Sequence, residues 1–153
     1  MKAKTIALAI SLVFVSVAMG FQDNPNMGTW KLNESKSTFA GKARNHTVVY
    51  EAAGDQIKVT VDGVDENGAA VHNEWTGKFD GKYYAVTGDA SGDSRSYRRV
   101  NKNTLALTNK KGDKTTLTGR IVVSADGKTR TVTTTATNAQ GKRVTSKAVY
   151  DKQ

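Results

Sequence analysis

The 153-residue chain contains no cysteine and a single proline. The absence of cysteine excludes a disulfide framework, a thiolate metal site, a cysteine nucleophile and the lipid-modified cysteine of bacterial lipoproteins. The fold must therefore be held together by packing alone. The chain also lacks a second long hydrophobic run after its first twenty residues, and its length fits one domain.

The first twenty residues have the features of a signal peptide. Lys2 and Lys4 precede the mostly apolar run 5–19, and Ala18 and Gly20 supply small residues where a signal peptidase cleaves. The run is shorter than the roughly 20 apolar residues that a membrane-spanning helix needs. We therefore expect residues 1–20 to be removed and residues 21–153 to form a single domain in the periplasm or outside the cell.

The remainder of the chain is rich in residues that favour strands. From Phe21 onward, 30 of 133 residues are large and apolar or aromatic, and 13 of these 30 are valine. Threonine is also frequent, most clearly in the run 131–137. Because β-branched side chains favour pleated structure, and no helical period is longer than two turns, the composition predicts an all-β protein.

Turn-forming pairs such as Asn67-Gly68 and Asp126-Gly127 divide this chain at regular intervals. The segments between the turns have the length of strands, and several alternate apolar and polar residues, which predicts one buried and one solvated face. The expected strands are 28–32, 45–52, 56–63, 69–78, 82–87, 94–100, 104–109, 113–124, 129–137 and 142–150.

Ten sequential antiparallel strands can form a sandwich or a barrel, and a barrel leaves no exposed edge. With about four inward positions on each strand, the interior needs about 40 side chains. This exceeds the 30 large apolar residues available, so smaller residues must fill the rest. We predict an up-and-down antiparallel β-barrel of about ten strands, with little or no helix and a partly polar cavity; a tightly packed sandwich is the alternative.

The sequence Gly28-Thr29-Trp30 at the start of the first expected strand resembles the opening of the calycins, which include lipocalins, fatty-acid-binding proteins and avidins. In these families the tryptophan closes the barrel floor, so the resemblance implies a structural role for Gly28 and Trp30. The last strand, with Ala148-Val149-Tyr150, resembles the closing strand of fatty-acid-binding proteins. From residue 28 to residue 152 the pattern is similar to small exported bacterial lipocalin-like proteins of unassigned function.

The chain also departs from these families. Ala148 stands where fatty-acid-binding proteins place the arginine that holds a carboxylate, so we expect fatty acids to bind weakly. Residues 33–43 are too few for the helical lid of those proteins and leave room for a loop or one helical turn. A biotin cage needs several tryptophans, and only Trp75 remains beyond Trp30.

These observations predict an exported, non-catalytic barrel that binds a small, mostly apolar molecule. Aromatic residues offer a flat apolar ring, and tyrosine adds a hydroxyl. Ordinary core packing is the alternative role for each of them. The candidate ligand-binding residues are Tyr50, Trp75, Tyr84, Tyr97 and Tyr150.

Motifs of catalysis and of cofactor binding are missing. Gly92-Asp93-Ser94 resembles a serine-hydrolase tripeptide, but no histidine follows it. No phosphate-binding or dinucleotide-binding glycine pattern occurs. His46 and His72 lack metal-ligand spacing, and the loop with Asp89 and Asp93 matches no calcium loop, so we expect surface histidines, a solvated loop, and neither a metal nor a cofactor.

The excess of basic residues offers an alternative function. Without Lys2 and Lys4 the chain has 21 cations and 14 anions, and the alternative is a solid-cored cell-envelope interaction protein with a cationic surface. Its partners would be an anionic envelope polymer or a membrane surface, and nucleic acid is not expected in an exported protein. The predicted cationic stripe comprises Arg95, Tyr97, Arg98, Arg99, Lys102, Lys110, Lys111, Lys114 and Arg120.

Overall fold

The computed structural model describes residues 23–153, so the predicted signal peptide lies outside the described residues. No helix in the described part of the chain is long and apolar enough to cross a membrane. The elements are β1 (Gly28–Leu32), a 3-10 helix η1 (Glu34–Lys36), β2 (Arg44–Ala53), β3 (Gln56–Val64), β4 (Ala70–Gly77), β5 (Asp80–Thr87), β6 (Ser94–Asn101), β7 (Thr104–Lys111), β8 (Lys114–Val123), β9 (Thr129–Thr137) and β10 (Arg143–Lys152).

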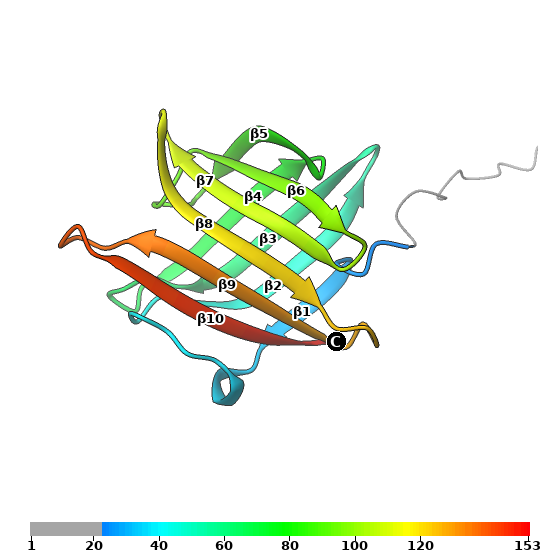
Figure 1. Cartoon of the computed structure of the whole chain (residues 1–153), viewed down its shortest axis with the longest axis horizontal. Coiled ribbons are helices and arrows are strands. Elements are labelled where there is room, and N and C mark those ends of the chain that lie inside the picture. The colour runs from blue at the N-terminus through cyan, green and yellow to red at the C-terminus, as the bar shows by residue number, and fades with distance from the viewer. Residues whose placement is uncertain (1–22) are drawn as a thin grey trace, which may run out of the picture.

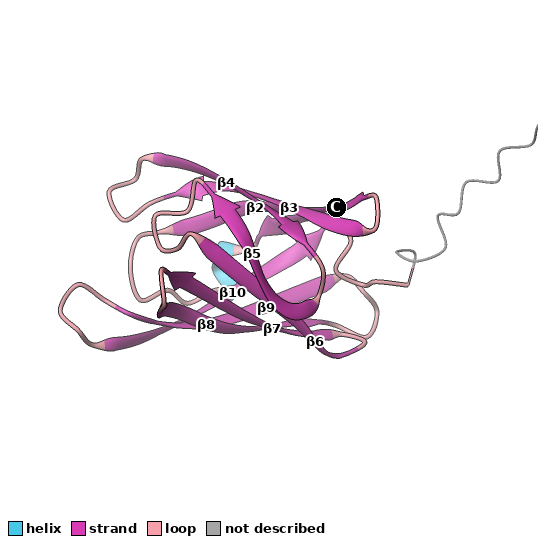
Figure 2. Cartoon of the chain, turned by 90° about the horizontal axis from the view of Figure 1, so that it is seen from above, coloured by secondary structure: helices cyan, strands magenta, loops and turns pink. Residues whose placement is uncertain are grey.

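The ten strands form a closed antiparallel barrel in which each strand pairs with its neighbours in sequence (Figure 1). The barrel closes where β1 pairs with β10, with Leu32 opposite Tyr150. Viewed from above, β2 to β4 form one wall and β6 to β8 the facing wall (Figure 2). The predicted all-β, up-and-down barrel is confirmed, and the alternative of an open sandwich is wrong.

The strand ends follow the turn residues, and each expected strand agrees with the observed one to within two residues. Glycines in the turns adopt a positive φ, as at Gly68 (82°) and Gly127 (71°), a conformation that other residues rarely adopt. The strand beginning at Asp80 starts two residues earlier than expected because β4 and β5 are joined by a very short connection.

The segment between β1 and β2 contains one short turn of helix in place of a lid. Asn33 caps η1 by accepting a hydrogen bond from the backbone N–H of Lys36. Beyond the turn, Thr38 forms an isolated antiparallel bridge with Lys147 of β10. This agrees with the expected loop or single helical turn.

Register decides which side chains lie inside the barrel, because directly paired residues project to the same face. Trp30, Val48, Val61 and Asn73 are linked by direct pairing across β1 to β4, and all four are buried. The buried apolar core comprises Trp30, Val48, Tyr50, Ile57, Val59, Val61, Trp75, Val86, Tyr97, Leu105, Ile121, Val123, Ala148, Val149 and Tyr150.

The same register corrects the predicted cationic stripe. Arg95 and Tyr97 are 6% and 3% exposed and project into the barrel, whereas Arg98 and Arg120 are exposed. Alternation along β6 separates the stripe into an inner and an outer part, because neighbouring residues of a strand face opposite ways.

Candidate functional site

Aromatic side chains from four strands and one turn meet inside the barrel. Trp75 of β4 contacts Tyr97 of β6 edge to face, with ring centroids 4.7 Å apart, and Tyr84 of β5 at 5.7 Å. Phe79, in the turn between β4 and β5, stacks on Trp75, and Tyr50 of β2 contacts both Phe79 and Tyr97. We call these five residues the aromatic cluster. They form one continuous, closely packed apolar cluster on one side of the interior.

Gly77 makes this packing possible. A Cβ atom at position 77 would lie 2.6 Å from ring atoms of both Trp75 and Tyr84. Trp75 is further fixed by its indole Nε1, which donates a hydrogen bond to the backbone carbonyl of Arg95 at 2.9 Å. The cluster is therefore a fixed surface, held by hydrogen bonding as well as by contact.

A buried guanidinium lies beside the cluster. Arg130 of β9 is 3% exposed, and its Nη2 donates a hydrogen bond to the hydroxyl of Tyr50 at 2.6 Å. Its charge lies over the rings of Tyr50, Tyr150 and Trp30 at 4.8, 5.4 and 6.0 Å. Nε and Nη1 have no hydrogen-bond partner among the described residues, so contact with the faces of aromatic rings stabilises this cation.

Burial changes the acidity of the two tyrosines beside Arg130. Burial raises the pKa of Tyr50, and the nearby charge of Arg130 offsets only part of this effect. Burial likewise raises the pKa of Tyr150. Both hydroxyls therefore stay protonated at neutral pH and can donate as well as accept hydrogen bonds.

Trp30 is fully buried close to the last residues of β10. Its Nε1 donates to the backbone carbonyl of Asn26 at 2.8 Å, and the Nζ of Lys152 lies 5.2 Å from the ring centroid. Gly28, with φ of 103°, turns the chain beside it. The role of barrel floor stays a prediction for Gly28 and Trp30.

A second buried cation has a full set of partners. Nη2 of Arg95 donates to Oδ2 of Asp89 at 2.6 Å, and its Nε donates to Oδ1 of Asn109 at 3.0 Å. Its Nη1 lies 3.4 Å from Oδ1 of Asn73. Asp89 was expected in a solvated loop, and that expectation is wrong because the ion pair draws its side chain inward, where it is 13% exposed.

Opposite the aromatic cluster, the inner surface of β8 to β10 carries small residues. Gly119, Thr134 and Ser146 form one row across these strands, and Leu117, Ala136 and Val144 form the next. All six project inward, yet they are only half-buried. We call Gly119, Thr134, Ala136 and Ser146 the small-residue wall, and their partial exposure means that the interior is accessible at this end of the barrel.

Two hollows open on the described part of the molecule. One of about 160 Å³ lies at the ends of β8 and β9 and includes the inward-facing Leu117 and Ala136 among its lining residues. Its lining therefore includes one residue of the small-residue wall, Ala136. Threonines make up most of its remaining lining, from Thr115 to Thr118 and from Thr135 to Thr137.

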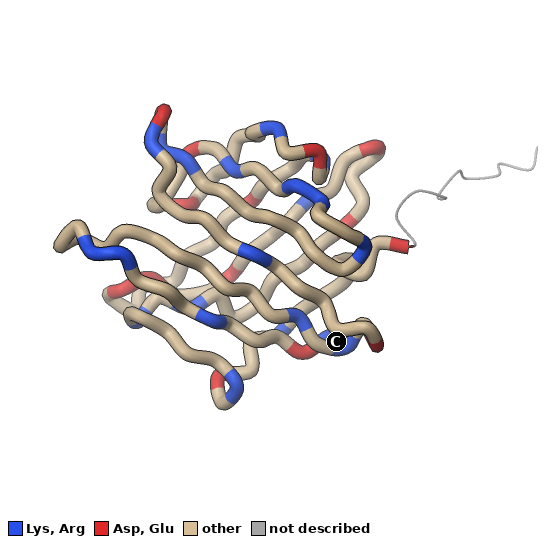
Figure 3. Tube along the Cα trace, viewed as in Figure 1, with Lys and Arg blue, Asp and Glu red and all other residues tan. Residues whose placement is uncertain are grey.

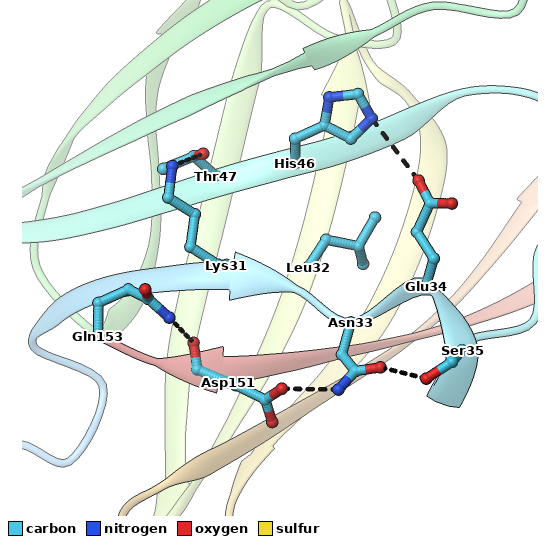
Figure 4. Close-up of a pocket in the computed structure, with 9 residues that line it drawn as sticks. All are labelled: Lys31, Leu32, Asn33, Glu34, Ser35, His46, Thr47, Asp151 and Gln153. Atoms are coloured by element: carbon cyan, nitrogen blue, oxygen red, sulfur yellow. Dashed lines mark hydrogen bonds and ion pairs between the residues drawn. The ribbon is translucent and has the colours of Figure 1, made fainter.

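The other hollow, of about 600 Å³, lies on the outside beside β1 and η1 (Figure 4). Its polar groups bond mainly to one another: Nδ2 of Asn33 donates to Asp151 at 2.6 Å, and Nζ of Lys31 donates to Thr47 at 2.8 Å. Leu32 is the one aliphatic side chain in its lining. This surface offers little apolar area to a ligand.

Both histidines are exposed, as expected, although the acidic neighbours of His72 were not anticipated. Its Nδ1 lies 2.6 Å from Asp62 and its Nε2 lies 3.5 Å from Glu74. Hydrogen bonding to Asp62, and then to Glu74, raises the pKa of His72. Within residues 23–153 there is no group of three or more His, Cys, Asp or Glu that could hold a metal ion.

The five predicted ligand-binding residues all belong to the interior. Tyr50, Trp75 and Tyr97 are buried and Tyr84 is half-buried within the aromatic cluster, while Tyr150 contacts the cluster's neighbour Arg130. Sequence reasoning did not find Arg95 and Arg130 as interior residues. A signal existed in β9, where residues 129, 131, 133, 135 and 137 are all threonine, so that Arg130 must share the opposite face with Val132.

No family model matches the chain, and no curated protein matches it. Among solved structures, the chain is similar to a redesigned β-barrel, mFAP1, determined bound to DFHBI. The two are 12% identical, with a TM-score of 0.46, over 85% of this chain and 97% of that chain.

Proposed function

We propose that the chain is an exported, non-catalytic barrel that binds a small, mostly apolar molecule in its interior. The observation that carries this proposal is the arrangement of two unlike inner surfaces. A fixed aromatic cluster lies on one side, and a half-buried wall of small residues faces inward on the other. Sites for small ligands are lined predominantly by apolar and aromatic side chains with a few polar groups.

The ligand would enter at the ends of β8 and β9. The hollow there includes Leu117 and Ala136, and the neighbouring turn between β9 and β10 follows Thr137. An apolar molecule would displace water from the small-residue wall and contact the cluster edge, which is favourable in proportion to the apolar area buried. Tyr97 and the polar residues beside it would orient any polar group that the ligand carries.

The experiment that tests this proposal is a titration with the neutral apolar dye Nile red. Ala136→Trp places a large ring on the inner wall, whereas Thr133→Trp places the same ring on the outer face of the same strand, away from the hollow, and the two variants form a matched pair. We expect saturable 1:1 fluorescence enhancement for the unmodified protein and Thr133→Trp, and at least about a tenfold weaker response for Ala136→Trp.

Equal dye binding by all three proteins would show that the dye binds elsewhere and would contradict the proposal. Absence of saturable dye binding by the unmodified protein would also contradict the proposal. Thermal unfolding of each variant establishes that the barrel is intact, so that loss of binding reports on the site itself.

A further inference from the structure

The basic residues of the chain are concentrated in one half of the barrel. Strands β1 to β5 contain four Lys or Arg and four Asp or Glu, whereas β6 to β10 contain eleven Lys or Arg and one acid, Asp151. Figure 3 shows the blue segments on the strands of this half, with red mainly at turns and chain ends. Two of the eleven, Arg95 and Arg130, are buried inside the barrel, and the other nine make this half strongly cationic.

The outward-facing cations of this half form a regular row. Arg98, Ala106, Arg120, Thr133 and Lys147 are directly paired across β6 to β10. Since neighbouring strands lie about 4.8 Å apart, a cation recurs about every 10 Å, with a small residue between. Arg98, Arg120 and Lys147 are exposed, and none of the ion pairs formed within residues 23–153 includes them.

A row of hydroxyl groups runs parallel to the row of cations. It consists of Thr108, Thr118, Thr135 and Thr145, again in direct register across β7 to β10; Ser96 of β6 continues the register but is buried. The hydroxyls of Thr135 and Thr145 are 3.2 Å apart. Because the two rows are two residues apart on every strand, they lie about 7 Å from each other.

The exposed large hydrophobic residues also belong to this side of the molecule. They are Tyr83, Val100 and Val122, and Tyr83 lies opposite Ser96 in register, with Nζ of Lys110 4.3 Å from its ring centroid. We call the outward-facing residues of β6 to β10, with Tyr83, the outer cationic face. It combines spaced cations, rows of hydroxyls and isolated apolar side chains.

We propose that the outer cationic face binds a linear anionic polysaccharide. Carboxylate or sulfate groups along such a chain complement the unpaired cations, and its sugar hydroxyls match the threonine hydroxyls, which both donate and accept. The apolar faces of sugar rings would contact Tyr83 and the exposed valines. This binding surface is separate from the barrel interior and does not depend on the proposed ligand.

Other polyanions fit the face less well. A site for single-stranded nucleic acid stacks bases on several aromatic rings, and Tyr83 is the one exposed large aromatic residue among those described. A membrane-binding face presents a continuous apolar surface, whereas Val100 and Val122 stand among polar residues. The hydroxyl rows are the feature that favours a polysaccharide.

Binding to heparin and to polygalacturonate tests this proposal, with dextran, phosphatidylglycerol vesicles and oligo(dT) as comparison probes. The face variant carries Arg98→Gln, Arg120→Gln and Lys147→Gln. The control variant carries Lys42→Gln, Lys58→Gln and Lys82→Gln, which lowers the net charge equally but lies outside the face. We expect both anionic polysaccharides to bind more tightly than vesicles or oligo(dT), in a manner that weakens with salt.

The face variant should bind the anionic polysaccharides at least about tenfold more weakly, and the control variant should stay within about twofold. In addition, Thr118→Val with Thr135→Val should weaken polysaccharide binding and leave adsorption to vesicles unchanged. Equal losses in the face and control variants would reduce the effect to net charge and overturn the proposal. So would tighter binding to vesicles or to oligo(dT), or no binding of either anionic polysaccharide.

Discussion

The carboxylate of Asp89 and the guanidinium of Arg95 form a buried ion pair, with Oδ2 and Nη2 2.6 Å apart. The pair joins the loop after β5 to the interior face of β6, and Asn109 of β7 donates to the same carboxylate oxygen at 3.0 Å. Removal of one partner leaves an uncompensated charge in a place shielded from water. The pair is therefore a point at which the barrel is sensitive to substitution.

Asp89→Asn should destabilise the protein by about 3 kcal/mol, because it leaves the buried guanidinium of Arg95 without a counter-ion. Asp113→Asn is a suitable control, since Asp113 is an exposed turn residue and should change the stability by less than about 0.5 kcal/mol. Denaturant unfolding of both variants measures the difference. Similar stabilities of Asp89→Asn and the unmodified protein would disprove the importance of the pair.

Strand 129–137 was predicted with its observed bounds, because Asp126-Gly127 marks its start and the threonine run defines its length. The alternation of apolar and polar residues alone does not determine that the barrel closes, since the pairing of Leu32 with Tyr150 joins residues far apart in the sequence. A local alternation of apolar and polar residues does not specify which distant strands pair.

The interior cations show where sequence reasoning fails. Arginine is seldom fully buried, so Arg95 was assigned to a surface stripe. Its partners are Asp89 on the preceding loop and Asn109 on the next strand, and they meet only once the register of β6 and β7 is set. Arg130 depends in the same way on Tyr50, which is 80 positions away in the sequence.

The pKa shift of Tyr50 predicts a specific alkaline instability. Because the folded state raises this pKa, the contribution of Tyr50 to stability is complete below its unfolded value near 10 and declines as the pH rises above it. Tyr50→Phe removes this dependence. Above pH 10, the difference in free energy of unfolding between the unmodified protein and Tyr50→Phe should therefore shrink by about 1.4 kcal/mol per pH unit. Chemical unfolding between pH 8 and pH 11 measures the two curves. A constant difference across this range would contradict the assignment.

Gly77 is predicted to be intolerant of even one added carbon. In Gly77→Ala the new Cβ would overlap the rings of Trp75 and Tyr84, and overpacking of this kind costs about 1–3 kcal/mol. Thr76→Ala, on the solvent side of the same strand, should change the stability by less than about 0.5 kcal/mol. Near-ultraviolet circular dichroism should change in Gly77→Ala alone, and an unchanged spectrum with unchanged stability would argue against a fixed aromatic cluster.

The contacts of His72 predict its titration. Asp62, and to a lesser extent Glu74, raise its pKa in the folded state, so the stabilisation is complete below the unfolded value near 6.5 and is lost as the pH rises through the folded value. A histidine ring titration by NMR should give a midpoint above 6.5 that falls in Asp62→Asn. An unchanged midpoint in that variant would mean that the hydrogen bond to Asp62 does not form in solution.

The measurement that tests the proposed function most directly is the location of a bound apolar molecule by amide NMR. During a titration with Nile red, the largest shifts should map to inward-facing residues around the small-residue wall, such as Leu117, Thr134 and Ala136, and to Tyr97 opposite them. Shifts confined to the outer faces of the strands, or no shifts at saturating dye, would contradict a binding site inside the barrel.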